Sequence, residues 1–327
     1  MHLFLAKQDI NLSLQSIFMG VLNQMPPYNL FGLEHQDYSV SRIAAFPIPY
    51  DSTVTYRSGA REGPAAIISA SRNLELYNHE LGITLPETFV FTMEAMAPDL
   101  NSPEGMIRRI EKEAGIAIDD GKVPFLIGGE HTISLGAIRA LASRSDDFSV
   151  LHIDAHSDSR NEIFGTKYSH ASIMARAREA VQSCYSIGIR SIDSESASLY
   201  GKDMLFIDEI HREGIQKSAE RILSRLGKRV YVTVDLDVLD PSEMPSVGTP
   251  EPDGLHYAEL RHILGSVFSK REIIGFDITE LCPIPGLVAP DFLAAKLAYS
   301  MACDLYKSTD STKTASRAKH PPNGRKS

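Results

Sequence analysis

Three short segments of this sequence combine carboxylate and imidazole side chains directly after strand-like apolar runs. They are Gly128-Gly129-Glu130-His131, Asp154-Ala155-His156-Ser157-Asp158 and Asp235-Leu236-Asp237. Because side chains alternate along a strand, Asp154 and His156 can point the same way, as can Asp235 and Asp237. Two imidazoles and four aspartates suit two divalent cations held side by side. We therefore predict a metal site built from His131, Asp154, His156, Asp158, Asp235 and Asp237.

The composition of this ligand set indicates which metal and which reaction to expect. Carboxylates and imidazoles without a thiolate favour Mn²⁺ over structural zinc, which prefers Cys and His. Two cations roughly 3.5–4 Å apart could share a water and lower its pKa, so hydrolysis is the natural reaction class. Taken singly, each segment could also be a polar turn or a helix start, so the prediction depends on their combination. His152 and His211 lie outside the segments and are interpreted as structural.

Strand-like and helix-like segments alternate along the part of the chain that carries these motifs. The predicted strands are 42–47, 89–92, 123–127, 148–154, 184–189, 204–207, 229–235 and 273–277. The predicted helices are 63–77, 103–120, 134–143, 170–181, 212–226, 257–267 and 289–306. Continuously apolar strands separated by helices indicate an α/β fold with a mostly parallel sheet covered on both faces. Ligands of such sheets bind beyond the carboxyl ends of the strands, where His131, Asp154, Asp235 and Glu280 occur.

Composition and chain length define the class of protein. The 327 residues, 43% hydrophobic and 23% charged, are ordinary for a globular protein. A net charge of -9 argues against nucleic-acid binding and is compatible with a cationic substrate. Three cysteines without regular spacing favour a reducing compartment. With neither a signal peptide nor an apolar run of membrane length, we predict a cytoplasmic protein that binds no membrane.

The organisation of the chain is predicted to be simple. Residues 1–38 lack a clear period and are expected to form an N-terminal arm, and residues 39–306 a single catalytic domain. Residues 307–327 are rich in Ser, Thr, Lys and Arg and are expected to form a disordered basic tail. Signatures of other chemistry are absent: the sequence has no Walker loop, no G-x-S-x-G elbow and no H-E-x-x-H helix.

In their order and content, these motifs resemble the ureohydrolase family of arginases and agmatinases. The resemblance extends to Pro49-Tyr50-Asp51, to the segment 56–64, to Gly248-Thr249-Pro250-Glu251-Pro252-Asp253-Gly254 and to Asp277-Ile278-Thr279-Glu280. It covers roughly residues 40–305. It implies a three-layer α/β/α fold with an eight-stranded, mostly parallel sheet of the arginase/deacetylase type.

The resemblance also implies a role for each site residue. His131, Asp154, Asp158 and Asp235 would hold one Mn²⁺, while Asp154, His156, Asp235 and Asp237 would hold the other, with Asp154 and Asp235 bridging. Asp158 would pass a proton to the leaving nitrogen. Glu280 would pair with the planar guanidinium of the substrate. His170, in Tyr168-Ser169-His170-Ala171-Ser172, matches a mobile-loop histidine that shuttles protons and contacts substrate.

Agmatine, cleaved to putrescine and urea, is the substrate that the resemblance favours. The segment Gly248–Pro252 is closer to agmatinases, and residues 160–167 do not resemble the segment with which arginases grip an α-carboxylate. Asp193 lies where an arginase holds the α-amino group, although it could equally cap a helix. Arginine, guanidinobutyrate and guanidinopropionate remain alternatives, as do a non-catalytic homologue and a single-zinc amidohydrolase of the deacetylase type. The family further implies a homo-oligomer, a trimer or hexamer.

Overall fold

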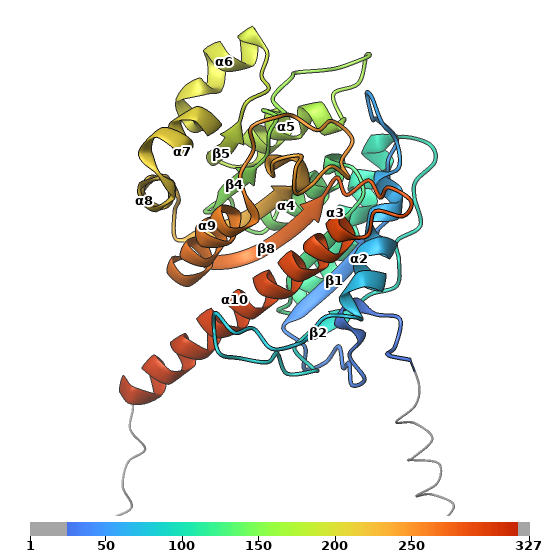
Figure 1. The fold of residues 1–327 in the computed structure, drawn as a ribbon, viewed down its shortest axis with the longest axis vertical. Helices are drawn as coiled ribbons and strands as arrows, with labels where there is room; N and C mark the ends of the chain where they lie inside the picture. Colours follow the sequence, from blue (N-terminus) through green and yellow to red (C-terminus); the bar gives the residue numbers. More distant parts are fainter. Residues whose placement is uncertain (1–24, 320–327) are drawn as a thin grey trace, which may run out of the picture.

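A computed structural model describes residues 25–319 of the chain, which form a three-layer α/β/α fold around one eight-stranded parallel sheet (Figure 1). The strands are β1 (Ile43–Ile48), β2 (Val90–Thr92), β3 (Val123–Gly128), β4 (Ser149–Ile153), β5 (Ser183–Ile189), β6 (Met204–Phe206), β7 (Arg229–Asp235) and β8 (Glu272–Thr279). Their order in the sheet is β2-β1-β3-β8-β7-β4-β5-β6. Each predicted strand is present, and the predicted fold class is confirmed.

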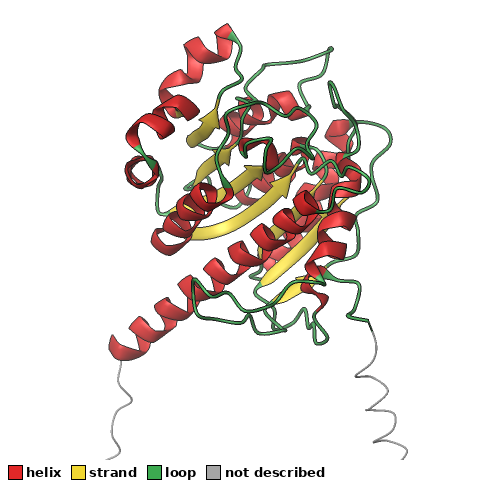
Figure 2. Ribbon diagram, in the orientation of Figure 1, coloured by secondary structure: helices red, strands yellow, loops and turns green. Residues whose placement is uncertain are grey.

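The two faces of the sheet are apolar because the strand residues alternate between them. In β1, Ile43 and Ala45 join one buried cluster, while Ala44 and Phe46 join the other. The helices that cover the second cluster are α3 (Pro103–Asp119), α4 (Ser134–Ala142) and α5 (Ile173–Ala180). Those that cover the first are α2 (Gly63–Ser71), α7 (Ile207–Glu213), α8 (Ile215–Arg225), α9 (Tyr257–Lys270) and α10 (Ala289–Lys319). Figure 2 shows the strands running between these helical layers. Both faces of each inner strand are therefore buried, as a parallel sheet requires.

Some helix boundaries differ from the prediction. The helix expected over 63–77 ends at Ser71, and α6 (Ser194–Tyr200) was not predicted. The helix expected over 212–226 corresponds to α8, which begins at Ile215, and α7 overlaps the predicted range only at its last two residues, before the break at Gly214. Gly214 adopts φ +84°, a conformation that ends α7 and that glycine adopts without steric cost.

The two ends of the described chain also differ from the simple arm and tail. Leu30, Phe31 and Leu33 of the predicted arm are buried against the core, and residues 1–24 lie outside the described residues. Helix α10 continues to Lys319, so residues 307–319 are helical, whereas the sequence predicted a disordered tail from 307. No proline interrupts this stretch before Pro321, which explains how the helix can continue. Residues 320–327 of the predicted tail lie outside the described residues.

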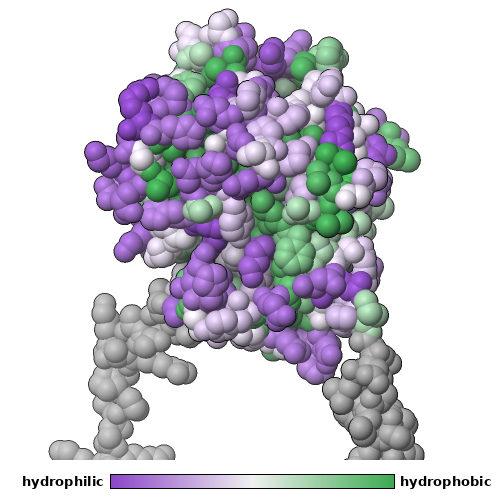
Figure 3. Space-filling model, viewed as in Figure 1, coloured by the Kyte–Doolittle hydropathy of each residue, from purple (hydrophilic) through white to green (hydrophobic). Residues whose placement is uncertain are grey.

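The surface and the thiols of the described chain are unremarkable for a globular fold. No helix within residues 25–319 has both the length and the apolar character needed to cross a membrane. Cys184, Cys282 and Cys303 are free thiols. The face seen in Figure 3 is mostly hydrophilic, with apolar groups gathered near the start of α10, where Val288 and Phe292 are exposed.

The strand order brings distant parts of the sequence to one place. Strands β3, β8, β7 and β4 are neighbours in the sheet and all run in the same direction. Ile153 of β4 pairs with Val234 of β7, and Asp235 pairs with Thr279 of β8, so these strands end at one level. The residues that follow these strands therefore meet at one edge of the sheet.

Candidate metal centre

The position of His131 depends on a close contact between the backbone at Gly129 and the end of β1. It opens a short 3-10 helix, η3 (His131–Ile133), which follows β3 after Gly129 and Glu130. The amide of Gly129 donates to the carbonyl of Ile48, and a Cβ on Gly129 would overlap the carbonyl oxygen of Tyr50. Glycine is required here because the chain must pass this close to the end of β1 before His131 turns inward.

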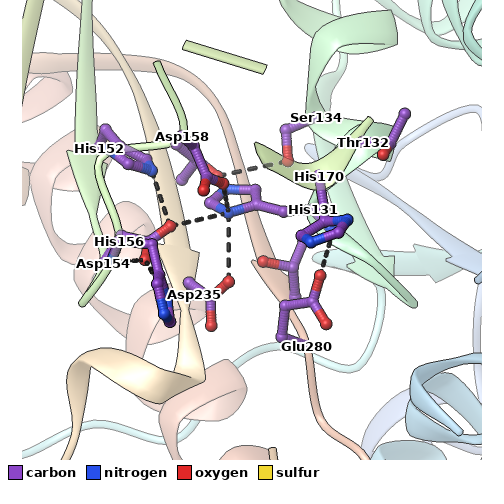
Figure 4. A network of polar contacts seen from close by, with 12 residues as sticks. His131, Thr132, Ser134, His152, Asp154, His156, Asp158, His170, Asp235 and Glu280 are labelled. Atoms are coloured by element: carbon purple, nitrogen blue, oxygen red, sulfur yellow. Dashed lines mark hydrogen bonds and ion pairs between the residues drawn. The ribbon is translucent and has the colours of Figure 1, made fainter. Parts of the chain in front are cut away.

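The ring of His131 faces three aspartates from three different parts of the chain. Its Nδ1 atom lies 3.0 Å from Asp154 Oδ2, 3.2 Å from Asp235 Oδ2 and 3.4 Å from Asp158 Oδ2 (Figure 4). This nitrogen is buried and has no hydrogen-bond partner among the described residues. Ligand atoms placed about 2.1 Å from one cation lie roughly 3.0–3.4 Å from one another, which matches these separations. His131 Nδ1 therefore lies at ligand–ligand distances from all three aspartates, and the ligand atoms of His131, Asp154 and Asp158 lie close enough together to hold one divalent cation.

The other nitrogen of His131 is held by a buried hydroxyl. Nε2 lies 2.7 Å from Thr233 Oγ1, and that hydroxyl donates to Asp277 Oδ1 at 2.6 Å. Because the hydroxyl hydrogen is used by Asp277, Nε2 carries the proton and donates it to Thr233. Nδ1 is then the nitrogen that faces the three aspartates and would bind a cation. Tyr231 donates to the other oxygen of Asp277 at 2.6 Å and so stabilises the arrangement.

A second group of ligands surrounds His156. Its Nδ1 atom lies 2.8 Å from Asp237 Oδ2 and 3.7 Å from Asp154 Oδ1. The two oxygens of Asp154 thus face different groups, Oδ2 toward His131 and Oδ1 toward His156. Asp235 Oδ1 accepts the amide of Asp237 at 2.9 Å, which leaves Oδ2 for the first group. Asp154 Oδ1 likewise accepts the amide of His156 at 2.5 Å, so the bridging roles of Asp154 and Asp235 both stay predictions.

The electrostatics of the cluster favour bound cations. Burial, together with repulsion from Asp237 and Asp154, raises the pKa of Asp235 well above its ordinary range. Burial also acts to raise the pKa of Asp154, but the charge of His152 and its hydrogen bond outweigh it and lower that pKa. Neighbouring buried carboxylates that cannot all ionise without cost are stabilised by positive charge between them.

His152 belongs to the surroundings of the site, although the sequence placed it outside the motifs. Its Nε2 atom lies 2.8 Å from Asp154 Oδ2, and its Nδ1 atom lies 3.1 Å from Ser186 Oγ. A histidine two residues before a ligand on the same strand shares its face, and that spacing could have revealed the contact. His211 lies apart from the site, with its ring 3.6 Å from Asp253.

A cavity of about 460 Å³ opens onto both groups of ligands. Its lining includes His156, Asp158, Asp235, Asp237, His170 and Glu280. Glu280 adopts φ +66°, and its Oε1 atom accepts the amide of His131 at 2.6 Å. Burial, followed by repulsion from Glu130, raises the pKa of Glu280 well above its ordinary range. The left-handed backbone of a non-glycine residue in a ligand cavity is typical of a functional position.

His170 is tied to a buried carboxylate through Thr53. Thr53 Oγ1 donates to Glu130 Oε1 at 2.9 Å and lies 3.2 Å from His170 Nδ1. Because the hydroxyl hydrogen belongs to Glu130, His170 Nδ1 donates to Thr53, and Nε2 is left as the basic nitrogen. Glu130 also accepts the amides of Ser52 and Thr53, each at 2.7 Å, so the carboxylate orders the whole loop. Neither Thr53 nor this role of Glu130 was predicted from the sequence.

Two further residues at the rim of the site, Arg190 and Asp193, have well-defined contacts. The guanidinium of Arg190 donates to the carbonyls of Asp237 at 2.7 Å and Glu251 at 3.0 Å and so joins two loops of the cavity. This role of Arg190 was not predicted from the sequence. Asp193 caps α6, because its carboxylate oxygens accept the amide of Ser196 at 2.9 Å and its hydroxyl at 2.7 Å. This is the capping alternative that the sequence allowed for Asp193.

Known proteins match both the sequence and the fold. The sequence model of the arginase family matches residues 41–303. The chain is 38% identical to N(1)-aminopropylagmatine ureohydrolase of Thermus thermophilus, over 83% of this chain and 92% of that protein. It is 32% identical to an agmatinase of Bacillus anthracis, over 78% of this chain and 88% of the relative. The crystal structure of agmatine ureohydrolase of Thermoplasma volcanium superposes with a TM-score of 0.78 at 31% identity, covering 90% of this chain and 99% of that one.

Proposed function

Since this chain belongs to the arginase family and is a ureohydrolase that cleaves guanidino C–N bonds, we propose that it hydrolyses N(1)-aminopropylagmatine to urea and a triamine. The proposed cofactor is a pair of Mn²⁺ ions. His131, Asp154, Asp158 and Asp235 would hold one, and Asp154, His156 and Asp237 the other, with Asp235 as the predicted second bridge. The observation that carries this proposal is Asp154, whose two oxygens face two separate ligand groups.

The side chains that line the cavity can be assigned separate roles in the reaction. When bound, a pair of divalent cations lowers the pKa of a water and so supplies the nucleophile for hydrolysis. Glu280 lines the cavity beside the ligands and would hold the planar guanidinium. Asp158 would carry a proton to the departing nitrogen. His170, with Nε2 basic, would exchange that proton with solvent.

The choice of substrate rests on the relatives and on the cavity. The relatives from Thermus thermophilus and Synechocystis, 38% and 35% identical, are named N(1)-aminopropylagmatine ureohydrolases, against 32% for the Bacillus anthracis agmatinase. A cavity of about 460 Å³ has room for the longer cation. Agmatine, the prediction from sequence, is the second candidate, and it is favoured by the fold match to an agmatine ureohydrolase. Arginine is disfavoured because Asp193 already binds Ser196 through both oxygens.

Urea release tests the proposal directly. The manganese-loaded protein would be given N(1)-aminopropylagmatine, agmatine, arginine and guanidinobutyrate in parallel, and Asp154→Asn would serve as the inactive control. We expect the highest kcat/KM with N(1)-aminopropylagmatine. A higher value with agmatine would support the second candidate, and a preference for arginine or guanidinobutyrate would contradict both. Elemental analysis would separate two manganese ions per chain from the single zinc of a deacetylase-type enzyme.

The predicted homo-oligomer and cytoplasmic location are retained as proposals. The exposed apolar side chains of Val288 and Phe292 at the start of α10 support an interface between copies, because such patches often mark contact surfaces. Light scattering on the purified protein would show a trimer or hexamer, and a monomer at all concentrations would contradict the proposal.

A further inference from the structure

A second polar cavity, of about 320 Å³, lies apart from the candidate metal centre. It opens beside the first residues of β5, whereas the metal centre follows the last residues of β3, β4, β7 and β8. The side chains and segments that line it come from the end of α5, the start of β5, the end of α6 with the turn after it, and the end of α8. We define this cavity by its charged lining residues Arg178, Lys202, Asp203 and Arg225.

Arg178 is the most unusual residue of this cavity. Its guanidinium lies 4.3 Å from the centre of the Tyr200 ring, and Nη1 donates to Ser159 Oγ at 2.9 Å. Its Nη2 atom is buried without a hydrogen-bond partner, and no carboxylate among the described side chains of residues 25–309 forms an ion pair with it. A guanidinium that is largely removed from water normally has an acidic partner, because an uncompensated buried charge is costly. Nη2 of Arg178 therefore has a hydrogen-bonding capacity that the described residues do not use.

The surrounding charges strengthen this positive character. Lys202 and Arg225 add two cations, and the single acid, Asp203, is already bound to Arg225 at 2.7 Å. Burial raises the pKa of the Cys184 thiol to about 12, so this residue adds no negative charge at neutral pH. The cavity thus carries excess positive charge in a protein whose net charge is -9. Such a local field attracts anions.

We propose that this cavity binds a small oxyanion, such as a phosphate or sulfate group, between Arg178 and Lys202. Arginine suits this role because its fork of N–H donors matches the oxygens of such a group. Binding of the oxyanion would also affect the metal centre. Ser159, which Arg178 holds, donates to the carbonyl of Ser157 at 2.7 Å, and Asp158 lies between these two serines. An oxyanion that orders Arg178 would therefore stabilise the segment that presents Asp158 to the metal site.

Sulfate is a suitable probe because it does not precipitate manganese. Calorimetric titration of the manganese-loaded protein, with chloride keeping the ionic strength constant, should give saturable binding of one sulfate per chain. Lys202→Met should weaken this binding roughly fivefold to tenfold, because it removes one partly screened charge at the site. Lys217→Met, the same change at an exposed position of α8 outside the cavity, should leave it unchanged. Arg178→Lys, which keeps the charge but loses the fork, should also weaken binding.

Several results would overturn the proposal. These are the absence of saturable binding, an equal effect of Lys202→Met and Lys217→Met, and sulfate binding that disappears when the metal is removed but survives Lys202→Met. The link to Asp158 is tested separately by hydrogen exchange, which should slow in residues 157–161 when sulfate is bound. Neither measurement depends on urea release, so the proposal can fail while the ureohydrolase function holds, and the reverse.

Discussion

Removing the hydroxyl of Thr233 tests whether this group sets the orientation and the tautomer of the His131 ring for metal binding. It accepts the Nε2–H of His131 and donates to Asp277, and all three side chains are buried. Thr233→Val removes only this hydroxyl from the middle of β7, and valine suits a buried strand. We expect the ring of His131 to lose its fixed orientation and its single tautomer, and Nδ1 to become a poorer ligand.

The size of the effect follows from the contacts that are lost. Removing a residue that orients a metal ligand typically weakens metal binding about tenfold to a hundredfold, which corresponds to about 1.4–2.8 kcal/mol. The metal-free protein should lose about 1–3 kcal/mol of unfolding free energy, because Nε2–H of His131 is left buried and unpaired. Asp277 still accepts a hydrogen bond from Tyr231, which keeps the loss near the lower end of that range.

The assay is a manganese titration in competition with a fluorescent chelator, combined with urea unfolding of the metal-free protein. Thr279→Val is the matched control, because it makes the same change in the adjacent strand. The Thr279 hydroxyl is buried and donates only weakly, to the carbonyl of Val234 at 3.3 Å. We expect its manganese affinity to stay within about twofold of the unaltered protein. Unchanged affinity in Thr233→Val, or an equal loss in Thr279→Val, would refute the role assigned to this hydroxyl.

Three further predictions concern the loops and the charges of the site. Thr53→Val should lower kcat roughly tenfold with little change in KM, because His170 loses the acceptor that sets its tautomer; equal kcat would contradict this. Arg190→Met should destabilise the protein by about 2–3 kcal/mol in urea unfolding, since several loop carbonyls lose their donor; unchanged stability would count against it. The raised pKa values of Asp235 and Glu280 mean that the metal-free fold binds more protons than the unfolded chain at pH values above their ordinary pKa values, 3.8 and 4.5. Stability of the metal-free protein should therefore fall as pH rises, and manganese binding should release protons, seen by calorimetry in buffers of different ionisation enthalpy; no proton release would contradict this.

Local sequence patterns were sufficient to predict the strands and the ligand motifs. The run 230–234 consists of β-branched and aromatic residues before Asp235, so both the strand and the acid at its end could be identified without any tertiary contact. The helix boundary at Gly214 was missed because a single glycine is compatible with a continuous helix.

The residues that hold the ligands in place depend on contacts between distant segments. Thr53 lies 117 residues from His170 in sequence, and Thr233 lies 102 residues from His131. A lone threonine in a strand or loop carries no sign that its hydroxyl will meet an imidazole, so neither contact could be predicted. Arg190 is similar, because its partners are backbone carbonyls, which every sequence has.

The sequence by itself determined the types of candidate ligand, their places at strand ends and the kind of chemistry that they permit, because these depend on side-chain identity and short spacing. Only the tertiary structure decided that β3, β8, β7 and β4 are neighbours, and hence that His131, Glu280, Asp235 and Asp154 meet at one edge. It also decided that the two oxygens of Asp154 face different ligand groups. Strand order and side-chain orientation result from packing two apolar faces against separate helical layers, and this packing depends on the whole chain at once.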